Sequence, residues 1–136
     1  MIQTPIILYV EDDPGSRKVM QLLVSGVMRN PHLIMFEDSV DFLQRLHALQ
    51  PRPNLVLLDI HVDPFDGFEI LDLIRHSAVF TAVPVVALTA SVMQEEVQRL
   101  KAAGFNGVIA KPIDLDHFPE QVERIMRGEV VWTIKK

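Results

Sequence analysis

Five short apolar runs recur along the sequence at regular intervals, and most of them are continuous rather than alternating. They cover residues 5–10, 32–36, 54–60, 84–88 and 107–110. Continuous apolar runs of this length are typical of strands that are buried on both faces of a parallel sheet. The runs therefore predict a parallel sheet with a covering layer on each side.

The segments between these runs carry apolar residues at helical spacing, which supplies the covering layers. The stripes are Val19, Leu22, Leu23 and Val27; Val40, Leu43 and Leu46; Phe68, Ile70, Leu71 and Ile74; Val97, Leu100 and Ala103; and Phe118, Val122 and Ile125. Ser39 and Asp114 stand where helix N-caps are expected, and Gly104 stands where a C-cap is expected. A strand followed by a helix, five times over, predicts an α/β fold with a doubly wound five-stranded parallel sheet.

The length of the chain, 136 residues, suits one domain with a substantial core. We expect a single domain over residues 1–136, with its core in residues 5–127 and a C-terminal tail in residues 128–136. In the tail, Val130, Trp132 and Ile134 alternate like one face of a strand. We expect this tail to pack within the protomer or across a homodimer, because leaving it bare would expose an apolar patch.

Composition excludes several classes of protein. The sequence has no cysteine, so it can form neither a disulfide framework nor a thiolate metal site, which fits a reducing cytosol. Its N-terminal apolar run lacks a basic flank and is too short for a signal peptide or a membrane span. A net charge of −5 gives no general attraction to nucleic acid. We expect a cytoplasmic protein that binds neither DNA nor membranes.

Reactive side chains follow the predicted strands. Glu11-Asp12-Asp13 follow the first, Asp59 closes the third, Thr89 follows the fourth and Lys111-Pro112 follow the fifth. Because ligands bind beyond the carboxyl ends of the strands in an open parallel sheet, these side chains should converge on one site. Carboxylates without cysteine or suitably spaced histidine favour a hard divalent cation such as Mg²⁺.

Together with the Asp66-Gly67 pair, these residues at this spacing resemble the receiver domain of two-component response regulators, over residues 5–127. The resemblance implies a flavodoxin-like sheet with strand order 2-1-3-4-5. It also implies that Glu11 and Asp12 form the family's acidic pair and that Asp59 is the phosphoacceptor.

The resemblance further implies how the site works. Asp12 and Asp59 would hold Mg²⁺, Glu11 would act mainly through a metal-bound water, and the backbone carbonyl of His61 would complete the protein ligands. Lys111 and Thr89 would each contact a phosphoryl oxygen. Such cationic and hydrogen-bonding groups are needed because a carboxylate that attacks an anionic phosphoryl group is repelled by it.

The implied function is that of a stand-alone response regulator. It would take a phosphoryl group from a phosphohistidine on a sensor histidine kinase or a histidine phosphotransfer protein. It would catalyse only its own aspartyl phosphorylation and dephosphorylation. A downstream protein target would then read the helix near residues 97–103, the strand 107–110 and the helix near residues 118–125.

Several positions tune or depart from the family pattern. His61, Ser91 and Pro112 are expected to modulate the site, with the Lys111-Pro112 bond in the cis form. Val108 stands where receivers often carry an aromatic switch residue, so we expect the switch to run mainly through Thr89. In the segment DIHVDPFDG, Asp63 is an additional carboxylate that we expect to face solvent.

Two other functions compete with this interpretation. An Mg²⁺-dependent phosphohydrolase of the haloacid-dehalogenase type also uses an aspartyl nucleophile, but it places a second Asp two residues later, where this chain has His61. The chain also leaves no room for a cap domain. A receiver-like scaffold that is never phosphorylated is disfavoured by the intact set of Glu11, Asp12, Asp59, Thr89 and Lys111. Asp13 is expected only to serve the N-terminus of the following helix.

Overall fold

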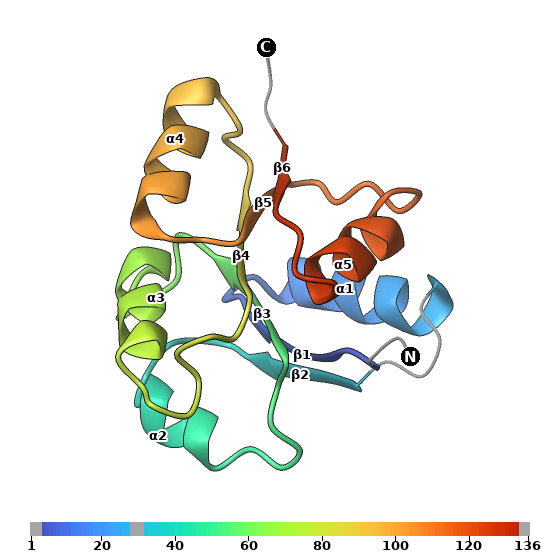
Figure 1. Ribbon diagram of the computed structural model, residues 1–136. Coiled ribbons are helices and arrows are strands. Elements are labelled where there is room, and N and C mark those ends of the chain that lie inside the picture. The colour runs from blue at the N-terminus through green and yellow to red at the C-terminus, as the bar shows by residue number, and fades with distance from the viewer. Residues whose placement is uncertain (1–3, 28–31, 134–136) are drawn as a thin grey trace.

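A computed structural model describes residues 4–27 and 32–133, which form an α/β sandwich around one parallel sheet (Figure 1). The strands are β1 (Ile6–Val10), β2 (His32–Phe36), β3 (Leu55–Asp59), β4 (Val85–Thr89), β5 (Gly107–Ala110) and β6 (Val131–Trp132). Their order across the sheet is β2-β1-β3-β4-β5-β6, and every pairing is parallel. The predicted order of the first five strands is confirmed.

The expectation of only five strands is wrong, because the tail adds a sixth. β6 pairs with β5, so that Val131 lies opposite Gly107 and Trp132 lies opposite Val108. The backbone N–H of Thr133 extends this pairing by donating to the carbonyl of Val108 at 3.0 Å. The prediction that the tail packs within the protomer is therefore confirmed, but the predicted face is not: Val131 is buried, Trp132 is half-buried and Val130 is 50% exposed. Ile134 lies outside the described residues.

Five helices cover the two faces of the sheet. They are α1 (Pro14–Val27), α2 (Phe42–His47), α3 (Gly67–Arg75), α4 (Gln94–Ala103) and α5 (Phe118–Met126). Figure 1 shows α1 and α5 on one face and α2, α3 and α4 on the other. Each face has its own apolar cluster, and most side chains of β1, β3 and β4 are fully buried between the two clusters. This burial explains why the strand sequences are continuously apolar.

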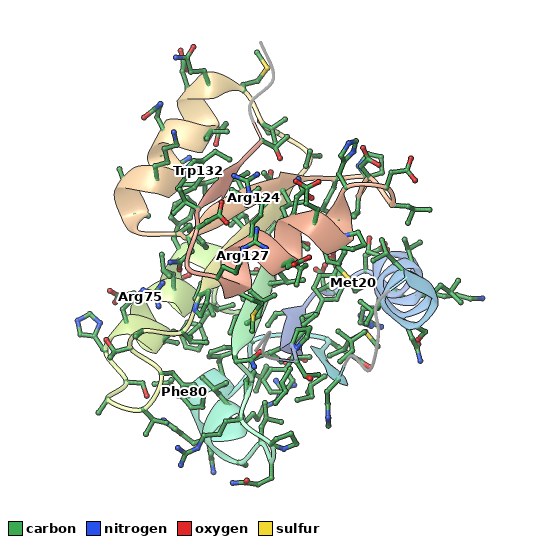
Figure 2. All side chains as sticks on the ribbon, turned by 45° about the vertical axis from the view of Figure 1, so that its right-hand side comes forward. Met20, Arg75, Phe80, Arg124, Arg127 and Trp132 are labelled. Carbon is green, nitrogen blue, oxygen red and sulfur yellow. The ribbon has the colours of Figure 1, made fainter. Side chains whose placement is uncertain are left out.

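The predicted apolar face of α1 is only partly right. The helix buries Met20, Leu23 and Val24, and Met20 is labelled in Figure 2, whereas Val19 and Leu22 are 51% and 66% exposed. Two overlapping apolar stripes run along this helix and share Leu23, so periodicity alone does not decide which stripe meets the sheet. The side chain of Val27 lies outside the described part of the chain.

Among the other predictions for the helices, some are confirmed and some are wrong. Val40 lies in the turn before α2 and is exposed, as is Ala103 in the last turn of α4. Gly104 ends α4 with a φ of 106°, so its predicted C-cap role is confirmed. The N-cap role predicted for Ser39 is wrong, because Asp41 precedes α2. Asp114 does cap the turn that leads into α5, since its Oδ1 accepts from the backbone N–H of Asp116 and its carbonyl accepts from the N–H of Phe118, both at 3.0 Å, although His117 directly precedes the helix. Among the described helices, none combines the length and the apolar character needed to cross a bilayer.

The pairing of β6 depends on a glycine in β5. A Cβ added to Gly107 would lie 2.7 Å from the backbone oxygen of Val131, closer than packed atoms come. Gly107→Ala should therefore push β6 away from β5 and lower the free energy of unfolding by about 1–3 kcal/mol, as overpacking does. Amide hydrogen exchange of Thr133, which should become faster, checks this result.

Gly26 in α1 provides the control, because a Cβ there would meet nothing within 4 Å. Gly26→Ala should leave the exchange of Thr133 unchanged and stabilise the chain slightly, since alanine favours a helix by roughly 0.5–1 kcal/mol over glycine. Equal exchange of Thr133 in wild type and Gly107→Ala would contradict the role given to Gly107.

Candidate functional site

The reactive side chains meet at one edge of the sheet, where β1, β3, β4 and β5 end. Asp59 and Thr89 are the last residues of β3 and β4, while Glu11 and Lys111 directly follow β1 and β5. One carboxylate oxygen from each of Glu11, Asp12 and Asp59 lies within 4.8 Å of the other two. The structure thus brings together the carboxylates, the hydroxyl and the lysine that the sequence singles out.

Glu11 is a fully buried carboxylate with two strong side-chain donors. Its Oε1 accepts a hydrogen bond from the Lys111 ammonium at 2.7 Å and another from the Tyr9 hydroxyl at 2.8 Å. Burial alone would raise the pKa of Glu11, but its interactions with Asp59, Lys111 and Tyr9 more than offset that effect and lower the pKa. Glu11 is therefore ionised in the metal-free site.

Asp59 is the second buried carboxylate, with 7% of its surface exposed. Its Oδ1 accepts a hydrogen bond from the backbone N–H of His61 at 3.2 Å, and its Oδ2 lies 3.8 Å from the Lys111 ammonium. Burial raises the pKa of Asp59, and the adjacent Glu11 carboxylate raises it further. Its pKa of about 6 still lies below neutral pH, so Asp59 is ionised as well as Glu11, and Lys111 alone does not balance the two charges.

This excess of negative charge suits a bound cation. The donors that Glu11, Asp12 and Asp59 offer are all carboxylate oxygens, the ligands preferred by hard divalent ions such as Mg²⁺. Asp12 is exposed, which leaves its oxygens open to an ion arriving from solvent. The donor set thus fits the metal that the sequence predicts.

Thr89 and Lys111 line the side of the site toward β4 and β5. The Thr89 side chain is buried, and its Oγ1 accepts a hydrogen bond from the backbone N–H of Ser91 at 3.1 Å, so the hydroxyl proton can be donated elsewhere. The backbone N–H of Lys111 donates to the Thr89 carbonyl at 2.9 Å. The Lys111-Pro112 bond is cis, as predicted.

The other predicted residues lie around this centre or away from it. His61, Ser91 and Pro112 are exposed at its rim. Val108 is fully buried in the cluster on the α2, α3 and α4 face, so its side chain is part of the core and not of the site. Asp63 faces solvent, as expected.

Asp13 has the structural role that was expected for it. Its Oδ2 accepts hydrogen bonds from both the backbone N–H and the hydroxyl of Ser16, each at 2.8 Å, in the first turn of α1. These bonds lower the pKa of the Asp13 carboxyl. The Asp13 carboxylate thus caps α1, which explains why only two of the three consecutive acidic residues belong to the acidic cluster of Glu11, Asp12 and Asp59.

Sequence reasoning missed two residues that support Glu11. The Tyr9 hydroxyl bonds the Glu11 carboxylate, and the Arg17 guanidinium donates to the Glu11 carbonyl at 2.9 Å. Tyr9 could have been found, because residues two apart on a strand point to the same face. Arg17 gave no such signal, since its position depends on how α1 leaves the sheet.

The loop from Asp59 to α3 is closed tightly at its base. The backbone N–H of Gly67 donates to the carbonyl of Ile60 at 3.0 Å, and a Cβ on Gly67 would lie 2.9 Å from the Ile60 Cα. Asp66 caps α3 by accepting from the backbone N–H of Glu69, whose side chain accepts in return from the N–H of Asp66. The Asp66-Gly67 pair therefore fixes where the loop ends.

A comparison with known families identifies the whole arrangement. A sequence profile described as "Response regulator receiver domain" matches residues 7–123. The "Probable methanogenesis regulatory protein FilR2" of Methanothrix harundinacea is 30% identical over 132 residues, which cover 93% of this chain and 84% of FilR2. The "Sensor histidine kinase AruS" of Pseudomonas aeruginosa is 35% identical over 112 residues, covering 81% of this chain but only 11% of AruS.

Solved structures show the same fold. The receiver domain of the sensor histidine kinase PA1611 from Pseudomonas aeruginosa has a TM-score of 0.76 at 23% identity. The match covers 93% of this chain and 100% of that domain, which was crystallised with a magnesium ion coordinated in its active-site cleft. The parallel sheet and its helices are therefore those of a known fold.

Proposed function

Because this chain belongs to the response regulator receiver family, we propose that it accepts a phosphoryl group on Asp59 and signals this event to a partner protein. The observation that carries the proposal is that Asp59 lies beside two other carboxylates and 3.8 Å from the Lys111 ammonium. A carboxylate nucleophile next to cation ligands and a lysine is the arrangement that phosphoryl transfer to aspartate requires.

The proposed donor is a phosphohistidine of a histidine kinase or of a histidine phosphotransfer protein. An oxygen of Asp59 attacks the phosphorus atom, an O–P bond forms, and the P–N bond to the donor imidazole breaks. The imidazole nitrogen leaves with the electron pair of that bond. The matching segment within the sensor histidine kinase AruS supports a place for this chain in histidine-kinase signalling.

Several residues would assist the transfer. When bound, Mg²⁺ would neutralise charge on the phosphoryl oxygens. Asp12 and Asp59 would hold the ion directly. Glu11 would hold it through a water molecule, and His61 through its backbone carbonyl. Lys111, which lies 2.7 Å from Glu11 in the resting site, would pair with a phosphoryl oxygen, and Thr89 would donate a hydrogen bond to another.

The rim residues would set how long the phosphorylated state lasts. His61 and Ser91 line a pocket of about 320 Å³ beside Thr89, on the side of the site toward α3 and α4. Water that hydrolyses the acyl phosphate would pass these side chains, which is the modulating role proposed for them. Pro112 would act differently, by holding the turn that carries Lys111.

We propose that the signal leaves through a face to which β6 contributes. The family resemblance pointed to α4, β5 and α5, but β6 covers the edge of β5. Figure 2 labels Trp132 on this strand, and the Lys101 ammonium of α4 lies 5.1 Å from the centre of its ring. A downstream target, or the second copy in a homodimer, would therefore meet α4, β6 and α5. Thr89 would start the conformational change, and Val108 would take part as a packed core residue.

The remaining parts of the proposal concern the chain as a whole. We propose a single receiver domain over residues 1–136, with its core in residues 5–127 and a tail in residues 128–136, because β6 of the tail is a strand of the same sheet. The cysteine-free sequence supports a cytoplasmic location. We propose no catalysis beyond the chain's own phosphorylation and dephosphorylation.

The test is to incubate the wild-type protein with acetyl phosphate, with and without Mg²⁺, and to measure its intact mass. We expect the addition of one phosphoryl group that requires Mg²⁺ and is removed by hydroxylamine, which cleaves acyl phosphates. If acetyl phosphate and a panel of phosphorylated histidine kinases all leave the mass unchanged, the proposed function is wrong.

A further inference from the structure

Ser39 is a buried serine in the connection between β2 and α2, and it is not a member of the acidic cluster of Glu11, Asp12 and Asp59. Its hydroxyl donates to the carbonyl of Phe65 and accepts from the backbone N–H of Phe65, both at 2.7 Å. Its own backbone N–H donates to the carbonyl of Asp63 at 3.0 Å. One fully buried residue thus makes three hydrogen bonds to residues 63–65.

These bonds hold the middle of the loop that leaves Asp59. The loop is fixed at its start by the His61 N–H, which donates to Asp59, and at its end by the contact of Gly67 with Ile60. Between these two points, Asp63, Pro64 and Phe65 are exposed and belong to no helix or strand. Ser39 therefore supplies the hydrogen bonds that fix this exposed stretch to the body of the protein.

We propose that Ser39 is a positioning residue of the metal site. By fixing residues 63–65, it sets the position of the preceding segment, including the His61 backbone carbonyl that would complete the Mg²⁺ ligands. A supporting group of this kind contributes to metal affinity because the ligand does not have to be ordered when the ion binds. The inference rests on the proposed function, which supplies the metal.

The chain offers a matched control for a purely structural effect. Ser77 is 9% exposed, and its hydroxyl lies 3.0 Å from the Nε2 of His47, beyond the C-terminal end of α3. Ser77→Ala also removes the hydroxyl of a buried serine, but its contacts lie at the opposite end of α3 from Asp66. Both alanine variants should lose thermal stability, whereas only Ser39→Ala should lose metal affinity.

The experiment is a calorimetric titration with Mg²⁺ of wild type, Ser39→Ala and Ser77→Ala, well below their melting temperatures. Ser39→Ala should bind Mg²⁺ about tenfold more weakly, the lower end of what the loss of a supporting partner costs. Ser77→Ala should bind within about twofold of wild type, since distant sites are usually independent. Unchanged affinity in Ser39→Ala, or equal weakening in both variants, would overturn the role of Ser39.

A second measurement uses the wild-type protein and so does not depend on the folding of a variant. If the Ser39 contact favours Mg²⁺ binding, Mg²⁺ must favour that contact by the same factor. Adding Mg²⁺ should therefore slow amide exchange of Phe65, whose N–H is bonded to Ser39, but not of Ser77, whose N–H is bonded to Ile74. Equal exchange of Phe65 with and without Mg²⁺ would refute the proposal.

Different results would contradict the proposed function and the positioning role of Ser39. If the wild-type protein bound no Mg²⁺ at all, the proposed function would be overturned together with the role of Ser39. If the wild-type protein bound Mg²⁺ and became phosphorylated, but Ser39→Ala bound it equally well, only the positioning role would be lost.

Discussion

Asp59→Asn should abolish Mg²⁺-dependent phosphorylation by acetyl phosphate or by a phosphorylated kinase, with no loss of stability. The amide cannot form the acyl phosphate, because it lacks the nucleophilic carboxylate oxygen. The fold should remain intact, since an amide oxygen can still accept the hydrogen bond from the His61 N–H and the change removes a like charge beside Glu11. Intact mass after the reaction and a thermal melt in metal-free buffer check both results.

Asp63→Asn is the matched control for this substitution. Asp63 lies in the same loop but faces solvent and is not part of the acidic cluster. This variant should take up one phosphoryl group as the wild type does. Equal uptake by Asp59→Asn and wild type would show that another residue is the acceptor.

Lys111→Ala should strongly destabilise the metal-free protein. The substitution removes the ammonium 2.7 Å from Glu11 and leaves two buried carboxylates without their nearest positive charge. Removing one partner of a buried ion pair lowers the free energy of unfolding by about 3 kcal/mol at the lower end of the usual range. The lower end applies here because the Lys111 side chain is partly exposed. For a domain of this size, we expect the melting temperature to fall by about 10 °C. Circular dichroism melts in EDTA measure this change.

Two further comparisons separate the charge effect from a general loss of packing. Adding Glu11→Gln to Lys111→Ala should restore part of the stability, because it removes the charge that Lys111 had balanced. Mg²⁺ should also narrow the gap between Lys111→Ala and wild type, since the ion supplies positive charge to the same site. Lys18→Ala, on the exposed side of α1, should change stability by less than about 0.5 kcal/mol. If Lys111→Ala melted as wild type does, the pairing with Glu11 would contribute nothing.

The sheet could be predicted because its strands are buried on both faces and therefore read as continuous apolar runs. The ends of β1, β3, β4 and β5 followed from those runs, and with them the positions of Glu11, Asp59, Thr89 and Lys111 at one edge. The prediction failed where two local patterns were equally good. On α1, the stripe through Met20 and the stripe through Val19 both look amphipathic, and only packing against the sheet selects between them.

The details of the site depend on contacts between segments far apart in the sequence. The pairing of Lys111 with Glu11 joins residues 100 positions apart, and the bonds from Ser39 to Phe65 span 26 positions. Serine is a preferred N-cap residue and Ser39 lies shortly before α2, so the local pattern predicted that it caps this helix. Its actual partner could be recognised only once the β3–α3 loop was folded beside it.

Tyr9 and Trp132 lie in different parts of the protein, so each can serve as an intrinsic optical reporter of its own surroundings. The sequence contains one tyrosine and one tryptophan. The Tyr9 phenol donates to Glu11 within the acidic cluster, whereas the Trp132 indole lies on β6 beneath the Lys101 ammonium of α4. Tyrosine absorbance should therefore follow events at the metal site, and tryptophan emission should follow the surface formed by α4 and β6. After phosphorylation, the delay between the two signals would measure the time that the conformational change takes to reach the α4 and β6 surface from the metal site, without an added label.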